Sequence, residues 1–91
     1  MSGDVRHNEA QSRYELEVDG GIAYSTYERR GDALHITHTV TPPALRGQGL
    51  AGRLMKGLFD DVRRQGLKIV PECSYVVAWL KRYPEEGDVV A

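Results

Sequence analysis

Residues 40–52 read VTPPALRGQGLAG, and a strand pattern gives way to a helical pattern within them. Pro42 and Pro43 must end the strand before them, because proline cannot donate to a strand ladder and restricts the residue that precedes it. Gly47 and Gly49 then leave backbone N–H groups unhindered where a helical pattern begins. Such N–H groups lie at the positive end of a helix dipole, so this turn predicts a phosphate site.

The residues that follow the turn have the spacing of an amphipathic helix. Apolar side chains recur three and four positions apart over roughly residues 48–65, and charged side chains occupy the other face. Gly66 fits the left-handed residue that ends many helices. The short apolar run 67–70 predicts a buried strand, parallel to the strand before the turn because the crossover is long.

The residues before the turn predict a three-stranded antiparallel meander. Apolar and polar residues alternate through Arg13–Val18, 22–29 and Ala33–Val40, as in strands that are buried on one face. The turn residues Asp19-Gly20-Gly21 and Arg30-Gly31-Asp32 separate these three runs.

A last helix is predicted at residues 75–83, with Ser74 as its N-cap and Pro84 just after its end. Together the elements predict an α+β fold, with a mixed, mostly antiparallel sheet of about four strands and two helices. The polar residues 1–12 are expected to be a flexible segment, and residues 13–91 to form a single domain.

Composition excludes several classes of protein. With 12 Lys and Arg against 13 Asp and Glu, the net charge of -1 leaves no positive surplus for nucleic acid. No apolar run suits a signal peptide or a membrane span, so a cytoplasmic location without membrane contact is expected. The single cysteine, Cys73, cannot form an internal disulfide. No histidine pair has ligand spacing, so no metal is expected.

The glycine spacing is compatible with more than one phosphate ligand. Gly47, Gly49 and Gly52 satisfy the G-x-G-x-x-G pattern of dinucleotide-binding domains, and Glu72 follows about twenty residues later. Those domains open with the strand–turn–helix unit and repeat it, whereas here a meander comes first. A nucleoside triphosphate loop needs Lys followed by Ser or Thr, which are absent after Gly52.

Residues 40–51 resemble the pyrophosphate-binding motif of the GNAT N-acetyltransferases, R/Q-x-x-G-x-G/A, with Arg46, Gly49 and Ala51 at its fixed positions. Almost the whole chain after Tyr14 is similar to a branch of very small, stand-alone members, the YjdJ-type N-acetyltransferase-like proteins. The fold is then a reduced GNAT-like fold. The residues in that branch's pattern are His38-Thr39, Pro42-Pro43, Gly66-Leu67-Lys68, Pro71, Cys73, Arg82 and Pro84-Glu85.

The resemblance implies acetyl-CoA as cosubstrate. Its pyrophosphate would bind the amides of the glycine-rich turn, and its pantetheine arm would lie beside the strand that ends at Thr39 and Val40. The acetyl group would lie between the splayed ends of the two parallel strands, where Cys73 is expected. The cofactor-binding residues implied are Thr39, Val40, Leu45, Arg46, Gly47, Gln48, Gly49, Leu50, Ala51 and Gly52.

Attack of an amine on a thioester needs a base, a donor for the oxyanion and an acid for the leaving thiolate. Relatives in the small branch usually carry a glutamate where this chain has Val40, and larger ones a tyrosine where it has Trp79. Cys73, just before a helix N-terminus, could accept the acetyl group or protonate the departing thiolate. His38 is the second catalytic candidate, as a relay base.

Both candidates also have a structural interpretation. Cys73 can be an inert buried thiol, and His38 shares a strand face with Leu34 and Ile36, which favours a core histidine. Three aromatic residues of the last helix are expected to serve in packing: Tyr75, Trp79 and Tyr83.

The favoured function is an acetyl-CoA-dependent N-acetyltransferase acting on an unidentified amine. Asp19-Gly20-Gly21 leaves no room for the helices that wall the acceptor site in larger relatives. An open acceptor site is therefore expected, which suits a protein amine. Two alternatives stay open: a module that binds acetyl-CoA or CoA without turnover, and a dinucleotide-binding or purely structural domain. The oligomeric state is open.

Overall fold

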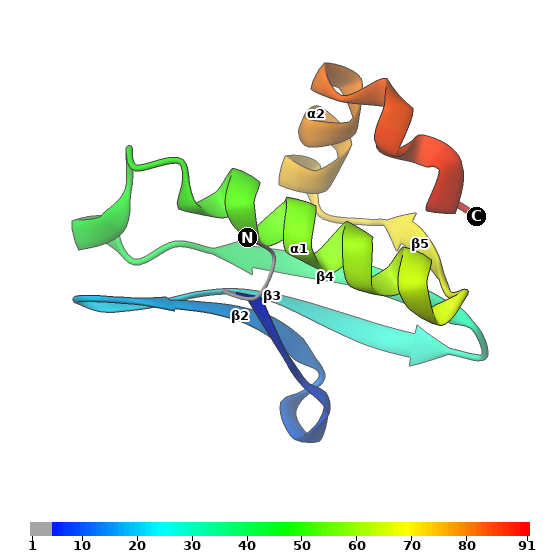
Figure 1. Cartoon of the computed structure of the whole chain (residues 1–91), viewed down its shortest axis with the longest axis horizontal. Coiled ribbons are helices and arrows are strands. Elements are labelled where there is room, and N and C mark those ends of the chain that lie inside the picture. Colours follow the sequence, from blue (N-terminus) through cyan, green and yellow to red (C-terminus); the bar gives the residue numbers. More distant parts are fainter. Residues whose placement is uncertain (1–4) are drawn as a thin grey trace.

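The computed structural model describes residues 5–91, which form one mixed sheet with its α-helices packed on one face. Figure 1 shows α1 running along the strands, with α2 and the C-terminal turns beyond it. The sheet order is β1-β2-β3-β4-β5, and only β4 and β5 are parallel. The elements are β1 (Val5–Asn8), the 3₁₀ turn η2 (Glu9–Gln11), β2 (Arg13–Val18), β3 (Gly21–Arg30), β4 (Ala33–Val40), η3 (Pro43–Leu45), α1 (Leu50–Gln65), β5 (Lys68–Pro71), α2 (Ser74–Arg82) and η4 (Pro84–Val89).

The core lies between the sheet and the apolar stripe of α1. Alternation along β2, β3 and β4 turns every second side chain toward the helix, as the sequence pattern predicts. The α+β class, the mixed sheet and the two α-helices are confirmed. The largest fully buried side chains in this core are Tyr14, Phe59, Leu16, Leu34, Ile36, Leu54, Met55, Leu58 and Ile69.

The sheet has five strands, one more than expected, because β1 pairs antiparallel with β2. This strand lies within the segment 1–12, where a flexible chain was expected; residues 1–4 of that segment lie outside the described residues. His7 stacks on Tyr14 with ring centroids 4.2 Å apart. Gly57 of α1 lets β1 come this close, because a Cβ there would collide with Val5. The burial of β1 thus depends on a distant glycine and not on its own pattern.

The start of α2 and the C-terminal tail differ from the sequence prediction. Cys73 is the N-cap of α2, without a side-chain cap, and Ser74 is the first helical residue and not the cap. The tail after Pro84, which shows no clear pattern, forms η4 and continues beside β5. There the amide of Ala91 donates to the carbonyl of Ile69 at 2.9 Å. The tail therefore covers the edge of β5, which protects an otherwise unpaired strand.

A β-bulge in β4 reverses the alternation of side chains. The register passes from Tyr27 opposite Ile36 to Thr26 opposite His38, which leaves Thr37 as the extra residue. His38 is consequently exposed, and the expectation that it shares a buried face with Ile36 is wrong. After the bulge it is Thr39, and not His38, that returns to the face of the helices.

The uncovered face of the sheet holds one buried carboxylate, that of Glu15, which is 2% exposed. It accepts hydrogen bonds from Arg6 at 2.7 Å, Asn8 at 2.9 Å and Arg13 at 2.7 Å. These bonds, that from Arg6 foremost, lower the pKa of Glu15 to about 2. Glu15 thereby joins β1 to β2 through charge as well as through the ladder.

We expect Glu15→Gln to destabilise the fold at neutral pH by about 1 to 3 kcal/mol, because three donors lose their charged acceptor. A carboxylate with a lowered folded-state pKa stabilises above its unfolded value, and that stability is lost as the pH falls toward about 2. Urea unfolding between pH 7 and pH 2.5 measures this. Glu17→Gln, at an exposed position of the same strand, is the control. Identical pH profiles for the two variants would contradict the assignment.

Candidate functional site

The glycine-rich turn between β4 and α1 has the backbone of an anion site. Gly47 and Gly49 have φ angles of 85° and 73°, in the left-handed region that other residues adopt only with strain. Gly49 is the N-cap of α1, and its carbonyl accepts the amide of Arg53 at 3.2 Å. The amides of the first helical turn have no acceptor within the helix, so they are directed at whatever lies in front of it.

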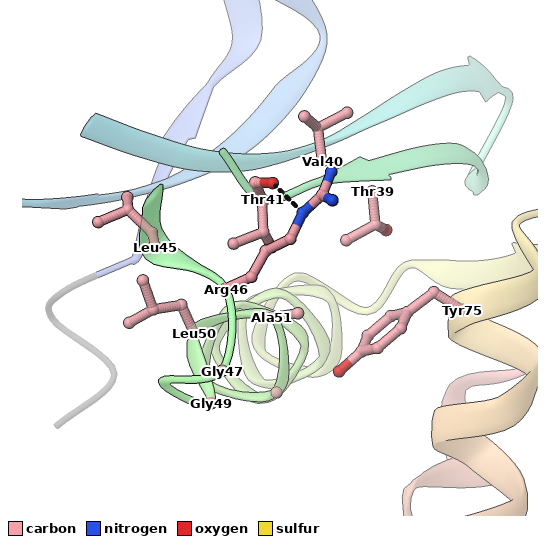
Figure 2. A pocket seen from close by; sticks show the side chains of 11 residues that line it. Thr39, Val40, Thr41, Leu45, Arg46, Gly47, Gly49, Leu50, Ala51 and Tyr75 are labelled. Carbon is pink, nitrogen blue, oxygen red and sulfur yellow. Dashed lines mark hydrogen bonds between the residues drawn. The ribbon is translucent and has the colours of Figure 1, made fainter. Parts of the chain in front are cut away.

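Leu45 fixes this turn to the rest of the molecule. It is 5% exposed and packs over the β2–β3 hairpin, where a Cβ on Gly20 would lie 3.4 Å from its Cδ2 atom. Arg46 follows it, and its Nε donates to the carbonyl of Thr41 at 3.1 Å. Figure 2 shows this side chain reaching from the turn to the end of β4. Its guanidinium brings positive charge to the space in front of the helix.

That space is a cavity of about 450 Å³. It lies between the end of β4, the glycine-rich turn and the start of α2 (Figure 2). All the residues that the resemblance assigns to the cofactor line this cavity except Gln48. The lining residues are Thr39, Val40, Thr41, Leu45, Arg46, Gly47, Gly49, Leu50, Ala51, Gly52 and Tyr75.

The two parallel strands part at Ile36, close to this cavity. The ladder between β4 and β5 ends with Ile36 opposite Pro71. Beyond it, the Ile36 carbonyl accepts both the Glu72 amide at 3.1 Å and the Cys73 amide at 2.9 Å. Cys73 and Thr39 face each other across the opening, with Sγ and Oγ1 3.6 Å apart. The thiol is therefore placed where the strands separate, as expected.

Cys73 is the first member of a directed chain of hydrogen bonds. Ser25 Oγ donates to the carbonyl of His38 at 3.1 Å, and a carbonyl can only accept. The Ser25 hydroxyl therefore accepts from Thr39 Oγ1 at 3.0 Å, and Thr39 in turn accepts from the thiol. Every hydrogen in the chain points away from the sulfur. In this arrangement Cys73 is a hydrogen-bond donor to Thr39.

Three other residues weighed from the sequence lie apart from Cys73. His38 is exposed on the face of β4 opposite to Thr39. The Val40 side chain points away from the cavity (Figure 2). Trp79 is 7% exposed and packs against Phe59 with ring centroids 4.8 Å apart, so its role in packing is as expected.

Tyr75 lines the cavity although its spacing predicts packing. Its hydroxyl oxygen lies 4.0 Å from the position that a Cβ on Gly52 would occupy, and Figure 2 shows the ring directed toward the start of α1. Burial raises the pKa of this phenol, which keeps it a donor. The sequence could have indicated this position of Tyr75, because the residue precedes Val76 and so lies outside the buried stripe of α2.

The residues that a dinucleotide site, a metal site or a membrane span would need can also be located in the structure. Glu72, which a dinucleotide site would use for the ribose, pairs with His35 Nδ1 at 2.5 Å. Among residues 5–91 no group of three or more His, Cys, Asp or Glu side chains could hold a metal ion. In the same described part of the chain, neither α-helix has the length and apolar character to cross a membrane.

The chain belongs to the GCN5-related N-acetyl-transferase family, whose pattern matches residues 13–89. It is similar to Protein NATD1 of Xenopus tropicalis and of Mus musculus, with 30% identity over 83 residues; the match covers 88% of this chain and 76% of each relative. Its fold is similar to that of a GCN5-like protein from Staphylococcus aureus solved by NMR. That match has a TM-score of 0.73 and 24% identity and covers 96% of this chain and 86% of the other.

These comparisons confirm the resemblance to the GNAT superfamily and the GNAT-like fold. A dinucleotide-binding domain is thereby set aside as an alternative. The YjdJ-type branch stays a prediction.

The positive φ of Gly49 gives a test of the turn. We expect Gly49→Ala to destabilise the fold by about 1 to 2 kcal/mol, because an L side chain is costly in the left-handed region. Gly52→Ala, inside α1, should instead stabilise by up to about 1 kcal/mol, since its Cβ meets no atom closer than 4.0 Å. Chemical denaturation measures both. Effects of the same sign would show that Gly49 is not held in the left-handed conformation.

Proposed function

We propose that this protein transfers the acetyl group of acetyl-CoA to an amine. One observation carries the proposal: Thr39, which lines the cavity in front of the anion turn, is also in contact with the thiol of Cys73 at 3.6 Å. The family membership supports the reaction class. A cytoplasmic location belongs to the proposal, since Cys73 must stay a free thiol.

The donor set of the cavity suits the coenzyme. The first amides of α1, together with the Arg46 guanidinium, would hold a pyrophosphate. The end of β4 at Thr39 and Val40 lines the same cavity and offers extended backbone to the pantetheine arm. Bound there, the coenzyme supplies an activated acetyl group. The glycines fit this role because side chains at Gly47 and Gly49 would meet no protein atom within 4 Å, so the space in front of them is free.

In the proposed reaction the amine nitrogen bonds to the carbonyl carbon, the carbon–sulfur bond breaks, and the departing thiolate takes a proton. We assign that proton to Cys73, because its S–H donates to Thr39 at the head of the hydroxyl chain through Thr39 and Ser25. The thiolate is the nucleophilic form of cysteine, whereas this chain uses the thiol as a donor, so its direction favours the acid role over a covalent acetyl-cysteine. The S–H···O bond of 3.6 Å is weak, and the hydrogen can turn from Thr39 to the leaving group.

The proton released by the amine needs a base, and His38 is the candidate. Its imidazole is exposed on the uncovered face of the sheet, two residues beyond Ile36, where the strands part. A neutral imidazole accepts protons near neutral pH. The assignment implies that the amine approaches from the uncovered face. The tight β2–β3 turn at Gly20 leaves that face without helices, which suits an amine on a protein.

A second candidate function is a module that binds CoA without turnover. Val40 and Trp79 cannot move a proton, and they stand where relatives are expected to carry a base and an acid. Binding and turnover must therefore be measured separately.

The first measurement concerns the coenzyme. Acetyl-CoA at about 100 times its Kd should stabilise the fold by about 2.7 kcal/mol. For a domain of this size the melting temperature should rise by roughly 10 to 20 °C. NAD is the control and should give little shift. Stabilisation by NAD with none by acetyl-CoA would overturn the proposal.

The second measurement concerns proton transfer. Cys73→Ala should leave acetyl-CoA affinity nearly unchanged and lower the transfer rate to a mixture of amines by roughly 100-fold, the usual scale for a general acid. His38→Asn should lower the rate without changing affinity. Intact mass after incubation without acceptor should show no acetyl group on Cys73. An acetylated Cys73 would establish the covalent route, and a wild-type protein that binds acetyl-CoA without any transfer would establish the binding module.

A further inference from the structure

Glu72 and Cys73 are consecutive residues whose side chains lie on opposite sides of the sheet, at the point where β4 and β5 part. Both backbone amides donate to the carbonyl of Ile36, at 3.1 Å and 2.9 Å. The Cys73 side chain packs against the core beneath the helices, whereas the Glu72 side chain reaches His35. A carboxylate therefore lies one residue away from the thiol, on the other side of the opening.

His35 shows that this carboxylate is on the uncovered face. Its neighbours in β4, Leu34 and Ile36, are 1% and 0% exposed beneath the helices, so the imidazole between them lies on the other side of the sheet. There His35 Nδ1 and Glu72 Oε2 are 2.5 Å apart. An ionised carboxylate can only accept hydrogen bonds, so Nδ1 carries the hydrogen. This bond holds the Glu72 side chain beside the opening.

No lysine or arginine of the described residues pairs with Glu72, whose side chain contacts only His35. Arg30 is near enough to feel its charge, but that guanidinium donates two hydrogen bonds to Glu28, at 2.9 Å and 2.7 Å. A neutral imidazole that donates one N–H leaves the carboxylate its negative charge. The Glu72 side chain is 49% exposed, and Oε1 accepts no hydrogen bond from the described residues, so this oxygen is open to a ligand.

Other carboxylates of the uncovered face differ from Glu72. Glu15 is buried and paired with two arginines, and Glu28 is paired with Arg30. Glu17 is exposed and forms no salt bridge within the described chain, but it lies on β2, two strands away from β4. Glu72 thus combines a charge that no cation neutralises with a position at the opening.

We propose that Glu72 binds the acceptor as its ammonium ion, and that the acceptor is therefore a cationic alkylamine. Such an amine carries three N–H donors at neutral pH, and Glu72 offers it a charged oxygen on the face from which the amine approaches. His38, on the same face, then removes the proton, and the neutral nitrogen leaves Glu72 to attack the thioester. Glu72 determines specificity and takes no proton. The inference rests on the proposed function.

The test compares a cationic acceptor, Nα-acetyl-lysine amide, with aniline, which is uncharged at neutral pH. Glu72→Gln keeps an oxygen acceptor for His35 and removes only the charge. It should raise the KM for the lysine amide about fivefold, as for loss of a partly exposed ion pair, with little change in kcat. The KM for aniline should stay at the wild-type value. Glu17→Gln removes the same charge from the same face and is the matched control, which should change neither KM.

The outcomes separate this subsite from the proposed function. A Glu72→Gln variant with an unchanged KM for the lysine amide, or with an equal rise for both amines, would overturn the subsite and leave acetyl transfer standing. An equal rise in Glu17→Gln would mean a general charge effect and would have the same consequence. A wild-type protein that acetylates neither amine would overturn both proposals. Thermal melts of each variant show that it is folded.

Discussion

The arrangement of the candidate site depends on the hydrogen bonds that the backbone carbonyl of Ile36 accepts. It accepts two backbone amides, from Glu72 and Cys73, and so marks where β5 leaves β4 and α2 begins. One residue later Thr37 forms the bulge that redirects the rest of β4. Beyond this level β4 continues without β5, and its last residues, from Thr39 on, line the cavity in front of the glycine-rich turn.

The elements around this opening are held by two kinds of interaction. The apolar stripe of α1 fixes the helix to the sheet, and an ion-pair network on its other side fixes the C-terminal turns. Lys56 and Arg63 reach Glu86 at 2.8 Å and 3.0 Å, and Arg63 also reaches Asp88 at 2.7 Å. Burial alone would raise the pKa of Glu86, yet the bonds from both cations outweigh it and lower the pKa. These ion pairs therefore hold the C-terminal turns against α1.

Much of this could be predicted from local patterns. The period of two before Pro42 and the period of 3.6 after Gly49 are set by which residues alternate, so strands, helices and the parallel crossover follow from the sequence. The conformation of the turn also follows, since Gly47 and Gly49 are free to adopt the φ angles that an anion site needs. The family motif lies within this same local stretch, which is why it was visible without a structure.

Local sequence patterns suffice to predict the order of elements, the apolar stripe of α1 and the glycine-rich turn, because each depends on neighbours within a few positions. Whether His38 or Thr39 faces the helices depends on the bulge in β4. Both residues are polar, so the alternation of apolar and polar residues in the sequence cannot reveal that bulge. Tertiary structure also decided that β1 joins the sheet, because that depends on Gly57 meeting Val5 more than fifty residues away. Tyr75 turns toward the cavity for the same kind of reason: Gly52, on another helix, leaves the space that its hydroxyl faces.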